Sequence, residues 1–345
     1  MTAMFGDLAA ARGQREEHGS MVEDWGVPPF SVLDTRQAYW QERRQRWLSM
    51  GMRGELGQEP EGPALDSVDG RGRQLLSNAT ERKGMGGDYD TSKGENAWGG
   101  SGTSVFDPVL CELAYRWWAP PGGLVLDPWA GGSVRGLVAA RLGHPYVGVD
   151  LSAAQVAANV MQLQLLERGD PQPTWHVGDS SSQLTQLVGG LEADMVFSCP
   201  PYYDLEVYSK DPRDLSAKGT YADFLEAYTA TIHAAAGHLR HGRFMVLVVG
   251  EIRDQRGALR GFVPDTMRAM VEAGLHLYND AILVNAVGSL PIRAGKYMRT
   301  SRKLGRVHQN VICAVKGDWD ETRTWVAQRE EPPQPQLGLG LEVGP

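Results

Sequence analysis

The first residues whose types and spacing could do chemistry are two aspartates near a glycine turn. In the segment LVLDPWAGGSVRG, Asp127 ends an apolar run and is followed by Ala130 and Gly131, and Asp150 ends the next apolar run. Small residues let the backbone approach a ligand, and an acidic side chain after the next strand can accept hydrogen bonds from both hydroxyls of a ribose. The pattern therefore predicts a site for a cofactor that contains a nucleoside.

The same turn indicates which nucleoside cofactor would fit. Its sequence is DPWAGG and not GxGxxG, the pattern that binds the pyrophosphate of a dinucleotide. The carboxylate of Asp127 would repel a phosphate, whereas it suits a cationic ligand with an ammonium group, such as S-adenosylmethionine. An ordinary strand-to-helix turn is the alternative interpretation.

A second group of residues follows the apolar run DMVF. It reads Ser198-Cys199-Pro200-Pro201-Tyr202. Two prolines fix φ and expose the preceding carbonyl without a local donor, and an aromatic ring directly after them can stack on a planar base. This turn could hold an exocyclic amino group, although a proline-terminated strand with tyrosines in the core is the simpler alternative.

A third feature is a run of cations in an acidic chain. The chain has 34 Lys and Arg against 42 Asp and Glu, a formal net charge of −8, yet the segment AVGSLPIRAGKYMRTSRKLGR contains six cations and no acidic residue. A solvated hairpin is the alternative, but cations concentrated beside the active edge of a sheet favour a loop that contacts phosphate. The six residues are Arg293, Lys296, Arg299, Arg302, Lys303 and Arg306. Arg43, Arg44 and Arg46 could add a second backbone contact.

The elements that must position these residues are predicted from Phe106 onward, where short apolar runs alternate with helical patterns. Repeated strand-helix-strand units predict an α/β fold, a doubly wound Rossmann-like sheet that is mostly parallel and has helices on both faces. No helical pattern separates the last two strands, DAILVNAV and VHQNVICAVKG. We therefore expect these two strands to pair as an antiparallel hairpin.

Composition excludes several protein classes. With 42% hydrophobic and 22% charged residues, the chain matches a globular protein. No apolar run reaches the ~18 residues that a membrane span needs, and the first residues lack the apolar core of a signal peptide, so a cytoplasmic location without a membrane partner is predicted. Cys111, Cys199 and Cys313 are too few for a disulfide framework or a structural metal site.

Taken in order, DPWAGGSVRG, YVGVDLS, GDS and SCPPYY resemble the S-adenosylmethionine-dependent DNA amino-methyltransferases, in particular phage-type modification methylases. The resemblance covers about residues 100–317. It implies that Asp127 and Gly131 face the methionine part of the cofactor, Asp150 the ribose and Asp179 the adenine. The cofactor site so implied comprises Thr103, Ser104, Asp127, Pro128, Ala130, Gly131, Asp150, Leu151 and Asp179, and the catalytic turn comprises Ser198, Cys199, Pro200, Pro201 and Tyr202.

The chain departs from this family at two positions. Asp107 stands where members often have Lys, and Cys199 stands where they have Asp, Asn or Ser to accept a hydrogen bond from the target amine. Sulfur is a weak acceptor, so the carbonyl of Pro200 or the hydroxyl of Ser198 would take that role, and the target base stays open between adenine and cytosine. A thiol also allows an alternative, attack on C6 of cytosine for C5 methylation.

The resemblance implies direct methyl transfer from S-adenosylmethionine to N6 of adenine or N4 of cytosine in double-stranded DNA. The base would be flipped out and stacked on Tyr202, and on Tyr203 as a second candidate, and no metal is required. An RNA or protein amide methyltransferase and a catalytically degenerate DNA-binding protein are the alternatives. A homodimer is compatible with the sequence.

The predicted organisation has four parts. Residues 1–83 form a small helical and irregular extension that could contact DNA, and residues 84–104 form a glycine-rich loop. Residues 105–318 form the methyltransferase domain, and residues 329–345 form a disordered tail rich in proline and glycine.

Overall fold

The computed structural model of the chain describes residues 21, 25–52, 105–205, 208–287, 290–318 and 320–322. Thr103 and Ser104, the predicted glycine-rich loop 84–104 and the predicted tail 329–345 lie outside the described residues. Their roles stay predictions.

The described residues alternate between strands and helices along the chain, as the apolar pattern predicts. The strands are β1 (Val32–Asp34), β2 (Val125–Asp127), β3 (Tyr146–Asp150), β4 (Thr174–Val177), β5 (Ala193–Ser198), β6 (Leu239–Val249), β7 (Leu275–Val284) and β8 (His308–Lys316). The α-helices are α3 (Ala38–Ser49), α4 (Pro108–Trp118), α5 (Val134–Arg141), α6 (Ala153–Met161), α7 (Ser180–Val188), α8 (Tyr221–His238), α9 (Phe262–Glu272) and α10 (Leu290–Ser301).

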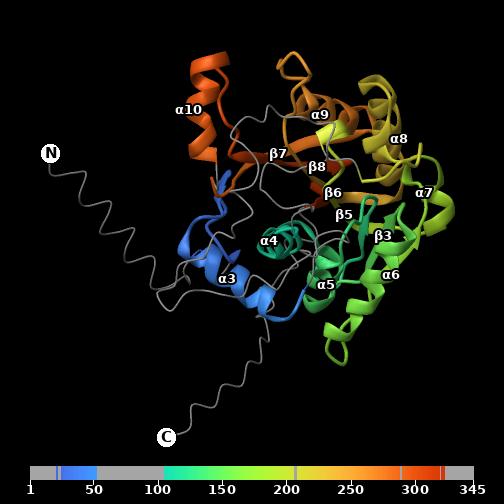
Figure 1. Ribbon diagram of the computed structural model, residues 1–345. Coiled ribbons are helices and arrows are strands. Elements are labelled where there is room, and N and C mark those ends of the chain that lie inside the picture. Colours follow the sequence, from blue (N-terminus) through green and yellow to red (C-terminus); the bar gives the residue numbers. More distant parts are fainter. Residues whose placement is uncertain are drawn as a thin grey trace, which may run out of the picture.

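These strands form one sheet in the order β1-β7-β8-β6-β5-β2-β3-β4 (Figure 1). The pairs among β2, β3, β4, β5 and β6 are parallel, and β8 lies antiparallel between β6 and β7. The chain therefore has the predicted α/β fold, a doubly wound and mostly parallel Rossmann-like sheet. The predicted antiparallel pairing of the last two strands is confirmed.

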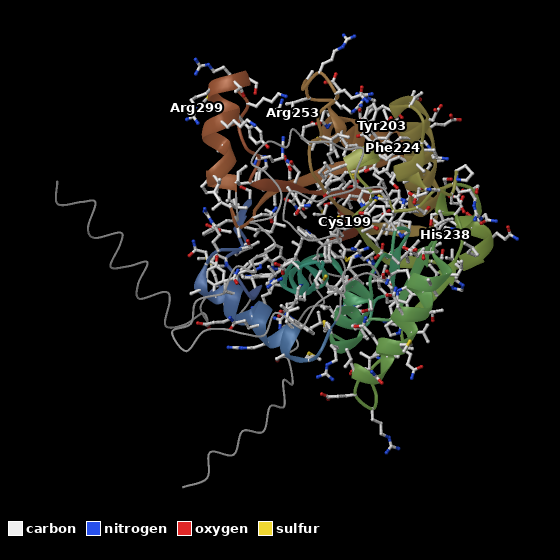
Figure 2. All side chains as sticks on the ribbon, in the orientation of Figure 1. Cys199, Tyr203, Phe224, His238, Arg253 and Arg299 are labelled. Atoms are coloured by element: carbon white, nitrogen blue, oxygen red, sulfur yellow. The ribbon has the colours of Figure 1, made fainter. Side chains whose placement is uncertain are left out.

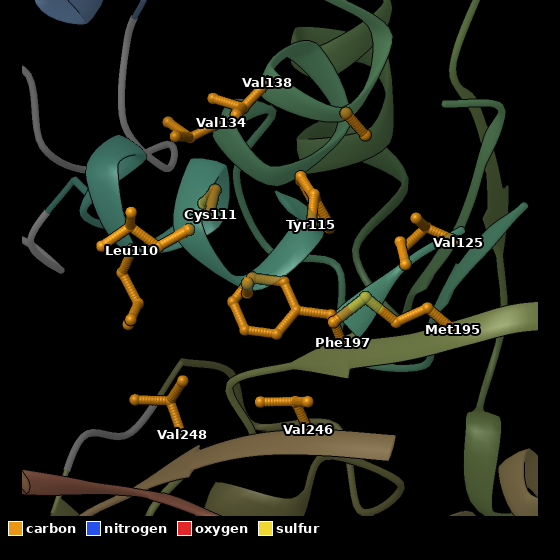
Figure 3. Packing of buried hydrophobic residues seen from close by; sticks show 14 of the residues in the cluster. Leu110, Cys111, Tyr115, Val125, Val134, Val138, Met195, Phe197, Val246 and Val248 are labelled. Atoms are coloured by element: carbon orange, nitrogen blue, oxygen red, sulfur yellow. The ribbon is translucent and has the colours of Figure 1, made fainter. Parts of the chain in front are cut away.

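Successive residues of each central strand enter two different cores, because side chains alternate across a sheet. Val125, Met195 and Phe197 pack against α4 and α5 on one face, as Figure 3 shows around Tyr115. On the other face, Leu126 and Val196 belong to the cluster that includes α8 and α9 residues. Both faces of β5 are buried, which explains why its sequence is a nearly continuous apolar run.

The segment between residues 25 and 52 belongs to this sheet and core. β1 pairs parallel with β7 at the sheet edge. Trp40 and Trp47 of α3 are buried, and their indole N–H groups donate to Asp107 at 3.0 Å and to Glu112 at 2.8 Å on α4. The sequence analysis placed these residues in a small extension, whereas they are integrated into the main body.

One predicted connection is wrong. The residues between β7 and β8 were expected to form a simple hairpin loop, and they contain the 12-residue helix α10. Pro291 is in the first turn of this helix, where its missing N–H is not needed, so the segment carries a helix-start signal that the sequence analysis did not use. α10 stands at one end of the molecule, beyond the end of the sheet core (Figure 1).

Among the described residues, no helix is both long and apolar enough to cross a membrane.

Candidate functional site

The candidate site lies at the carboxyl ends of β2, β3 and β5. β2 has β3 on one side and β5 on the other, so the chain connections diverge between β2 and β5. Ligands of doubly wound sheets bind in the crevice at such a switch point. Asp127, Asp150 and Ser198 are the last residues of these three strands, so the fold brings the two predicted turns together.

The turn after β2 is tied to the end of β3. Gly131 has φ 49°, in the left-handed region that favours glycine, and its N–H donates to Asp150 Oδ2 at 2.9 Å. The carbonyl of Gly131 accepts from Asn159 Nδ2 at 2.7 Å, and Asp150 Oδ1 accepts from the Ser152 N–H at 2.8 Å. Asp150 is only half-buried, which is compatible with the predicted ribose contact. Because the Gly131 N–H is already engaged, this turn does not offer it to an anion.

Asp127 is fully buried and accepts four hydrogen bonds. Oδ2 accepts from Arg135 Nε at 2.6 Å and from the Tyr146 hydroxyl at 2.7 Å. Oδ1 accepts from the Ser198 hydroxyl at 2.5 Å and from the Trp129 N–H at 3.2 Å. These bonds occupy the roughly four acceptor positions of a carboxylate. We therefore correct the predicted direct contact with the methionine part: Asp127 holds the turn and the end of β5 together.

Arg135, on α5, is the cation of this buried network. Its guanidinium also donates to the carbonyls of Trp129 at 2.5 Å and Ala130 at 2.8 Å, and it lies over the ring of Phe106. Burial by itself lowers the pKa of Arg135, but Asp127, Tyr146 and Cys199 together outweigh burial and raise this pKa well above its usual range. Arg135 therefore stays charged, and it forms an ion pair with the acidic residue that was expected to face a cationic ligand.

Ser198 also has an internal role. Its side chain is fully buried, and its hydroxyl donates to Asp127. This bond uses the hydroxyl hydrogen and links β5 to β2, while the hydroxyl oxygen keeps lone pairs that could accept. The predicted role of Ser198 as an acceptor for the target amine stays a prediction.

Pro128 and Ala130 are buried as well. The Pro128 carbonyl accepts from the Ser180 hydroxyl at 2.6 Å, and the Ala130 N–H donates to the Val149 carbonyl at 2.9 Å. These two residues shape the turn from inside and do not present side chains to a ligand. Leu151 is half-buried directly after β3, so its predicted contact with the cofactor stays a prediction.

Asp179 caps α7. Its Oδ1 accepts from the N–H and the hydroxyl of Ser181 at 2.9 and 2.7 Å, and its Oδ2 accepts from the Ser182 hydroxyl at 2.9 Å. An N-cap aspartate of this kind has a sufficient structural reason to be present. Asp179 lies after β4 at the same edge of the sheet and is half-buried, so contact with an adenine stays a prediction.

The turn after β5 fixes Tyr202 at its hydroxyl end. The hydroxyl donates to the Val248 carbonyl at 3.2 Å, accepts from Gln309 Nε2 at 2.7 Å and lies 3.7 Å from Cys199 Sγ. Burial raises the pKa of Tyr202 well above its usual range, and the nearby Cys199 adds to this shift, so the phenol stays protonated at neutral pH. Tyr202 and Cys199 are half-buried, and Cys199 lies near the middle of the molecule in Figure 2.

The two prolines leave one acceptor open. Pro200 is buried and Pro201 is half-buried. Within the part of the chain that the structure describes, the Pro200 carbonyl accepts no hydrogen bond. This carbonyl is therefore open to a further donor, and its predicted role as acceptor for the target amine stays a prediction.

Tyr203 does not serve as a second stacking platform. It is 6% exposed, has φ 52° and packs against Tyr221 and Phe224, with Arg260 4.9 Å from the centre of its ring. Figure 2 shows Tyr203 and Phe224 close together within the aromatic cluster. The expectation that a base could stack on Tyr203 is therefore wrong.

The predicted phosphate-contacting cations lie on α10 and on the segment that leads into β8. Lys296, Arg299, Arg302 and Arg306 are exposed and Lys303 is half-buried. The side chain of Arg293 lies outside the described residues. Arg43 and Arg44, in contrast, face acidic residues of α4 and its N-cap, Glu112 at 2.7 Å and Asp107 at 3.9 Å.

Three residues that hold the site were missed by sequence reasoning. Arg135 neutralises Asp127, Asn159 holds the Gly131 carbonyl, and Gln309 holds Tyr202. The sequence held a signal for Asn159, because this residue lies four positions after Gln155 in a helical pattern. In the structure the two side chains lie on one face of α6 and bond at 2.8 Å. Among the described residues, no cluster of three His, Cys, Asp or Glu side chains could hold a metal ion.

No family model matches the chain, and a search of curated proteins finds no match. Solved structures do resemble it. A TehB-like SAM-dependent methyltransferase from Corynebacterium glutamicum is 16% identical, with 62% of this chain and 90% of that chain covered and a TM-score of 0.37. TrmN from Thermus thermophilus is 18% identical, with 61% and 49% covered and a TM-score of 0.39.

A third example is the magnesium protoporphyrin IX methyltransferase of Synechocystis with bound SAM. It is 16% identical, with 57% of this chain and 71% of that chain covered and a TM-score of 0.36. Similarity at this level concerns the fold and not the substrate. The strand order and the switch point themselves establish that the chain has a Rossmann-like α/β fold with its candidate site at the carboxyl ends of β2, β3 and β5.

Proposed function

We propose that the protein transfers a methyl group from S-adenosylmethionine to an exocyclic amino group of a base in double-stranded DNA. The observation that carries this proposal is the position of the Cys199-Pro200-Pro201-Tyr202 turn. It follows β5 directly, at the switch point, beside the turn that Gly131 and Asp150 form after β2 and β3. A nucleoside cofactor and a planar amine would therefore meet at the same sheet edge.

The charges at this edge support a cofactor without phosphate. Asp150 and Asp179 both lie there, and Arg135, the cation of the turn, is buried in its pair with Asp127. The Gly131 N–H, which could have held a pyrophosphate oxygen, is bonded to Asp150. S-adenosylmethionine combines a ribose for Asp150 with a positively charged methionine part, so it suits this acidic edge better than a dinucleotide does.

The turn after β5 supplies an acceptor and a stacking surface. When bound, S-adenosylmethionine supplies the electrophilic methyl group. In this proposal the Pro200 carbonyl, which no described backbone N–H bonds, accepts a hydrogen bond from the target amine and so orients the lone pair of the amine. The ring of Tyr202, held at its hydroxyl by Val248 and Gln309, offers a fixed face for a flipped base. Orientation, without a covalent intermediate, is the chemistry that these groups can provide.

The test is a labelled-methyl assay on unmodified duplex DNA of varied sequence, followed by mass analysis of the nucleosides. We expect N6-methyladenine or N4-methylcytosine. Absence of methyl incorporation, with duplex RNA and protein offered in parallel, would contradict the proposal for DNA, and incorporation into RNA or protein would replace DNA as the substrate.

Cys199→Ala separates the two cytosine mechanisms. Amine methylation requires no thiol, so the variant should retain activity within about tenfold, whereas C5 methylation requires the thiolate as nucleophile and should be abolished. Tyr202→Ala is the matched loss-of-function variant, and we expect its rate to fall by a factor of 100 or so because the base loses its orientation. Detection of 5-methylcytosine that depends on Cys199 would overturn the proposed chemistry.

A further inference from the structure

A short hairpin after β6 carries cations of its own. Residues 253–259 fold back on themselves, with an antiparallel bridge between Arg253 and Leu259 and a bond from the Asp254 N–H to the Ala258 carbonyl at 2.9 Å. Arg253 donates to the Gly257 carbonyl at 2.7 Å, and the Asp254 carboxylate accepts from the Ala258 N–H at 2.8 Å. The hairpin is therefore held by its own hydrogen bonds.

This hairpin contacts the segment that follows α10. Gly257 has φ 87°, and a Cβ at this position would meet the end of the Lys303 side chain. Burial lowers the pKa of Arg306, Glu251 opposes this shift, and the positive charge of Arg253 adds to it. Two elements that are far apart in sequence thus bring cations together.

We call the cations of the hairpin, of α10 and of the segment after α10 the basic surface. None of them forms an ion pair with any residue that the structure describes, and all are exposed except Lys303, which is half-buried. Figure 2 shows Arg253 and Arg299 at the same end of the molecule. The basic surface consists of Arg253, Arg256, Lys296, Arg299, Arg302, Lys303 and Arg306.

Both elements are joined in the chain to residues that lie beside Tyr202. A Cβ at Gly250, three residues before the hairpin, would lie 3.3 Å from Tyr202 Cε2. Gln309, three residues after Arg306, donates to the Tyr202 hydroxyl. The hairpin thus follows, and the segment after α10 precedes, a residue that lies beside Tyr202.

We propose that the hairpin 253–259 and α10 with its following segment hold the phosphate backbone of one DNA duplex, and that the hairpin is a second contact element separate from α10. The inference rests on the proposed function for the choice of DNA. Cations that cluster without forming ion pairs repel one another, and phosphates relieve that repulsion. Exposed apolar side chains on the same elements, Leu259, Ile292 and Leu304, suit a ligand that has sugar and base surfaces rather than an isolated anion.

The test measures binding of a short fluorescein-labelled DNA duplex by anisotropy over a range of KCl concentrations. Two double variants are compared with the full-length wild type: Arg253→Gln/Arg256→Gln in the hairpin and Lys296→Gln/Arg299→Gln in α10. Each should weaken binding to all duplex sequences and reduce the slope of log K against log salt by about 1.8, since each phosphate contact contributes about 0.9. Circular dichroism checks that the variants are folded.

A matched control removes the same charge elsewhere. Arg213→Gln/Arg268→Gln also removes two exposed cations, but these two residues are paired with Asp211 and Asp265. The control should bind DNA with the wild-type slope. An unchanged slope in the hairpin variant, or equal competition by duplex RNA or by anionic vesicles at the same phosphate concentration, would overturn the inference.

This binding test does not depend on methyl transfer. Suppose that the hairpin variant shows the expected reduction in slope while no methyl group is transferred to DNA. The basic surface then stands and the proposed function is contradicted. If methyl transfer to DNA occurs and the hairpin variant binds as the wild type does, the proposed function stands and the hairpin has no part in binding.

Discussion

The buried cation beside the turn after β2 and the exposed cations of the basic surface differ in their partners. Arg135 is buried and forms an ion pair with Asp127 at 2.6 Å, and it donates to two backbone carbonyls of the turn. Arg299 and Arg253 are exposed and have no ion pair with a described residue. The same side-chain type therefore serves two purposes in one chain.

This difference indicates what the charged side chains do in each region. A buried pair needs all of its hydrogen bonds inside the protein, so it fixes geometry and has nothing left for a ligand. Exposed cations outside ion pairs keep hydrogen-bond donors for a ligand and add little to the stability of the fold. The charge of Arg135 positions the turn after β2, whereas the cations of the basic surface are accessible to a ligand such as phosphate.

Arg135→Met tests the buried half of this comparison and should have the largest effect. Removal of the guanidinium leaves the fully buried Asp127 carboxylate uncompensated, which costs about 3–5 kcal/mol of unfolding free energy. Urea denaturation followed by tryptophan fluorescence measures the change.

The matched control for that prediction is Arg213→Met, which breaks the exposed pair with Asp211. Its unfolding free energy should stay close to that of the wild type. Equal destabilisation by the two substitutions would show that burial does not distinguish the pairs. Adding Asp127→Asn to Arg135→Met should recover part of the loss, because the uncompensated charge is then gone.

The triple variant Lys296→Gln/Arg299→Gln/Arg302→Gln tests the exposed half. We expect the apparent KM for duplex DNA to rise by about tenfold at moderate salt, since three phosphate contacts are lost, while kcat stays close to the wild-type value. The unfolding free energy should not fall. A stable variant with an unchanged KM would contradict a role of α10 in DNA binding, and a destabilised one would mean that these cations support the fold.

Gln309→Met tests the contact between Tyr202, in the turn after β5, and the strand that follows the basic surface. It removes the donor to the Tyr202 hydroxyl, so we expect kcat to fall a few-fold and stability to fall by about 0.5–1.5 kcal/mol, with the KM for S-adenosylmethionine unchanged. Tyr202→Phe removes the other end of the same bond. If the bond positions the ring, the two substitutions are not additive in kcat, whereas additive effects would show that Gln309 does not act through Tyr202.

The fold could be predicted from the sequence because its signals are local. A run such as DMVFS reports burial on both faces of β5, and an apolar run that ends in Asp reports the end of a strand at the site edge. The switch point follows from the order of such units. The positions of the Gly131 turn and the Tyr202 turn were predicted for the same reason.

The roles of individual side chains were less predictable, because they depend on partners that are distant in the fold. Nothing near Asp127 in the sequence says that Tyr146 and Ser198 will both donate to it. The ring of Tyr203 is buried and that of Tyr202 is half-buried, and nothing local in the adjacent tyrosines of PPYY distinguishes the two. The helix α10 was missed because its charges suggested a loop and its early proline was not used as a start signal.

His308, at the base of the basic surface, should have the smallest effect. Its Nε2 lies 2.9 Å from Arg306 Nη1, and because the guanidinium only donates, the imidazole nitrogen accepts and the ring is neutral. Burial, and then the charge of Arg306, lower the pKa of His308 below its usual value of 6.5. The unfolded chain consequently binds a proton at higher pH than the folded chain does, and this residue's contribution to stability is lost as the pH falls from 6.5 through the folded pKa.

His308→Gln keeps an acceptor for Arg306 and cannot be protonated. Urea denaturation at a series of pH values should therefore show that the stability of the wild type falls more steeply than that of the variant below pH 6.5, and that the two curves run parallel above pH 7. Parallel curves over the whole range would mean that the charge of Arg306 is not felt at His308. Bound duplex DNA should weaken the difference, because a phosphate beside Arg306 offsets the charge that holds the pKa of His308 down.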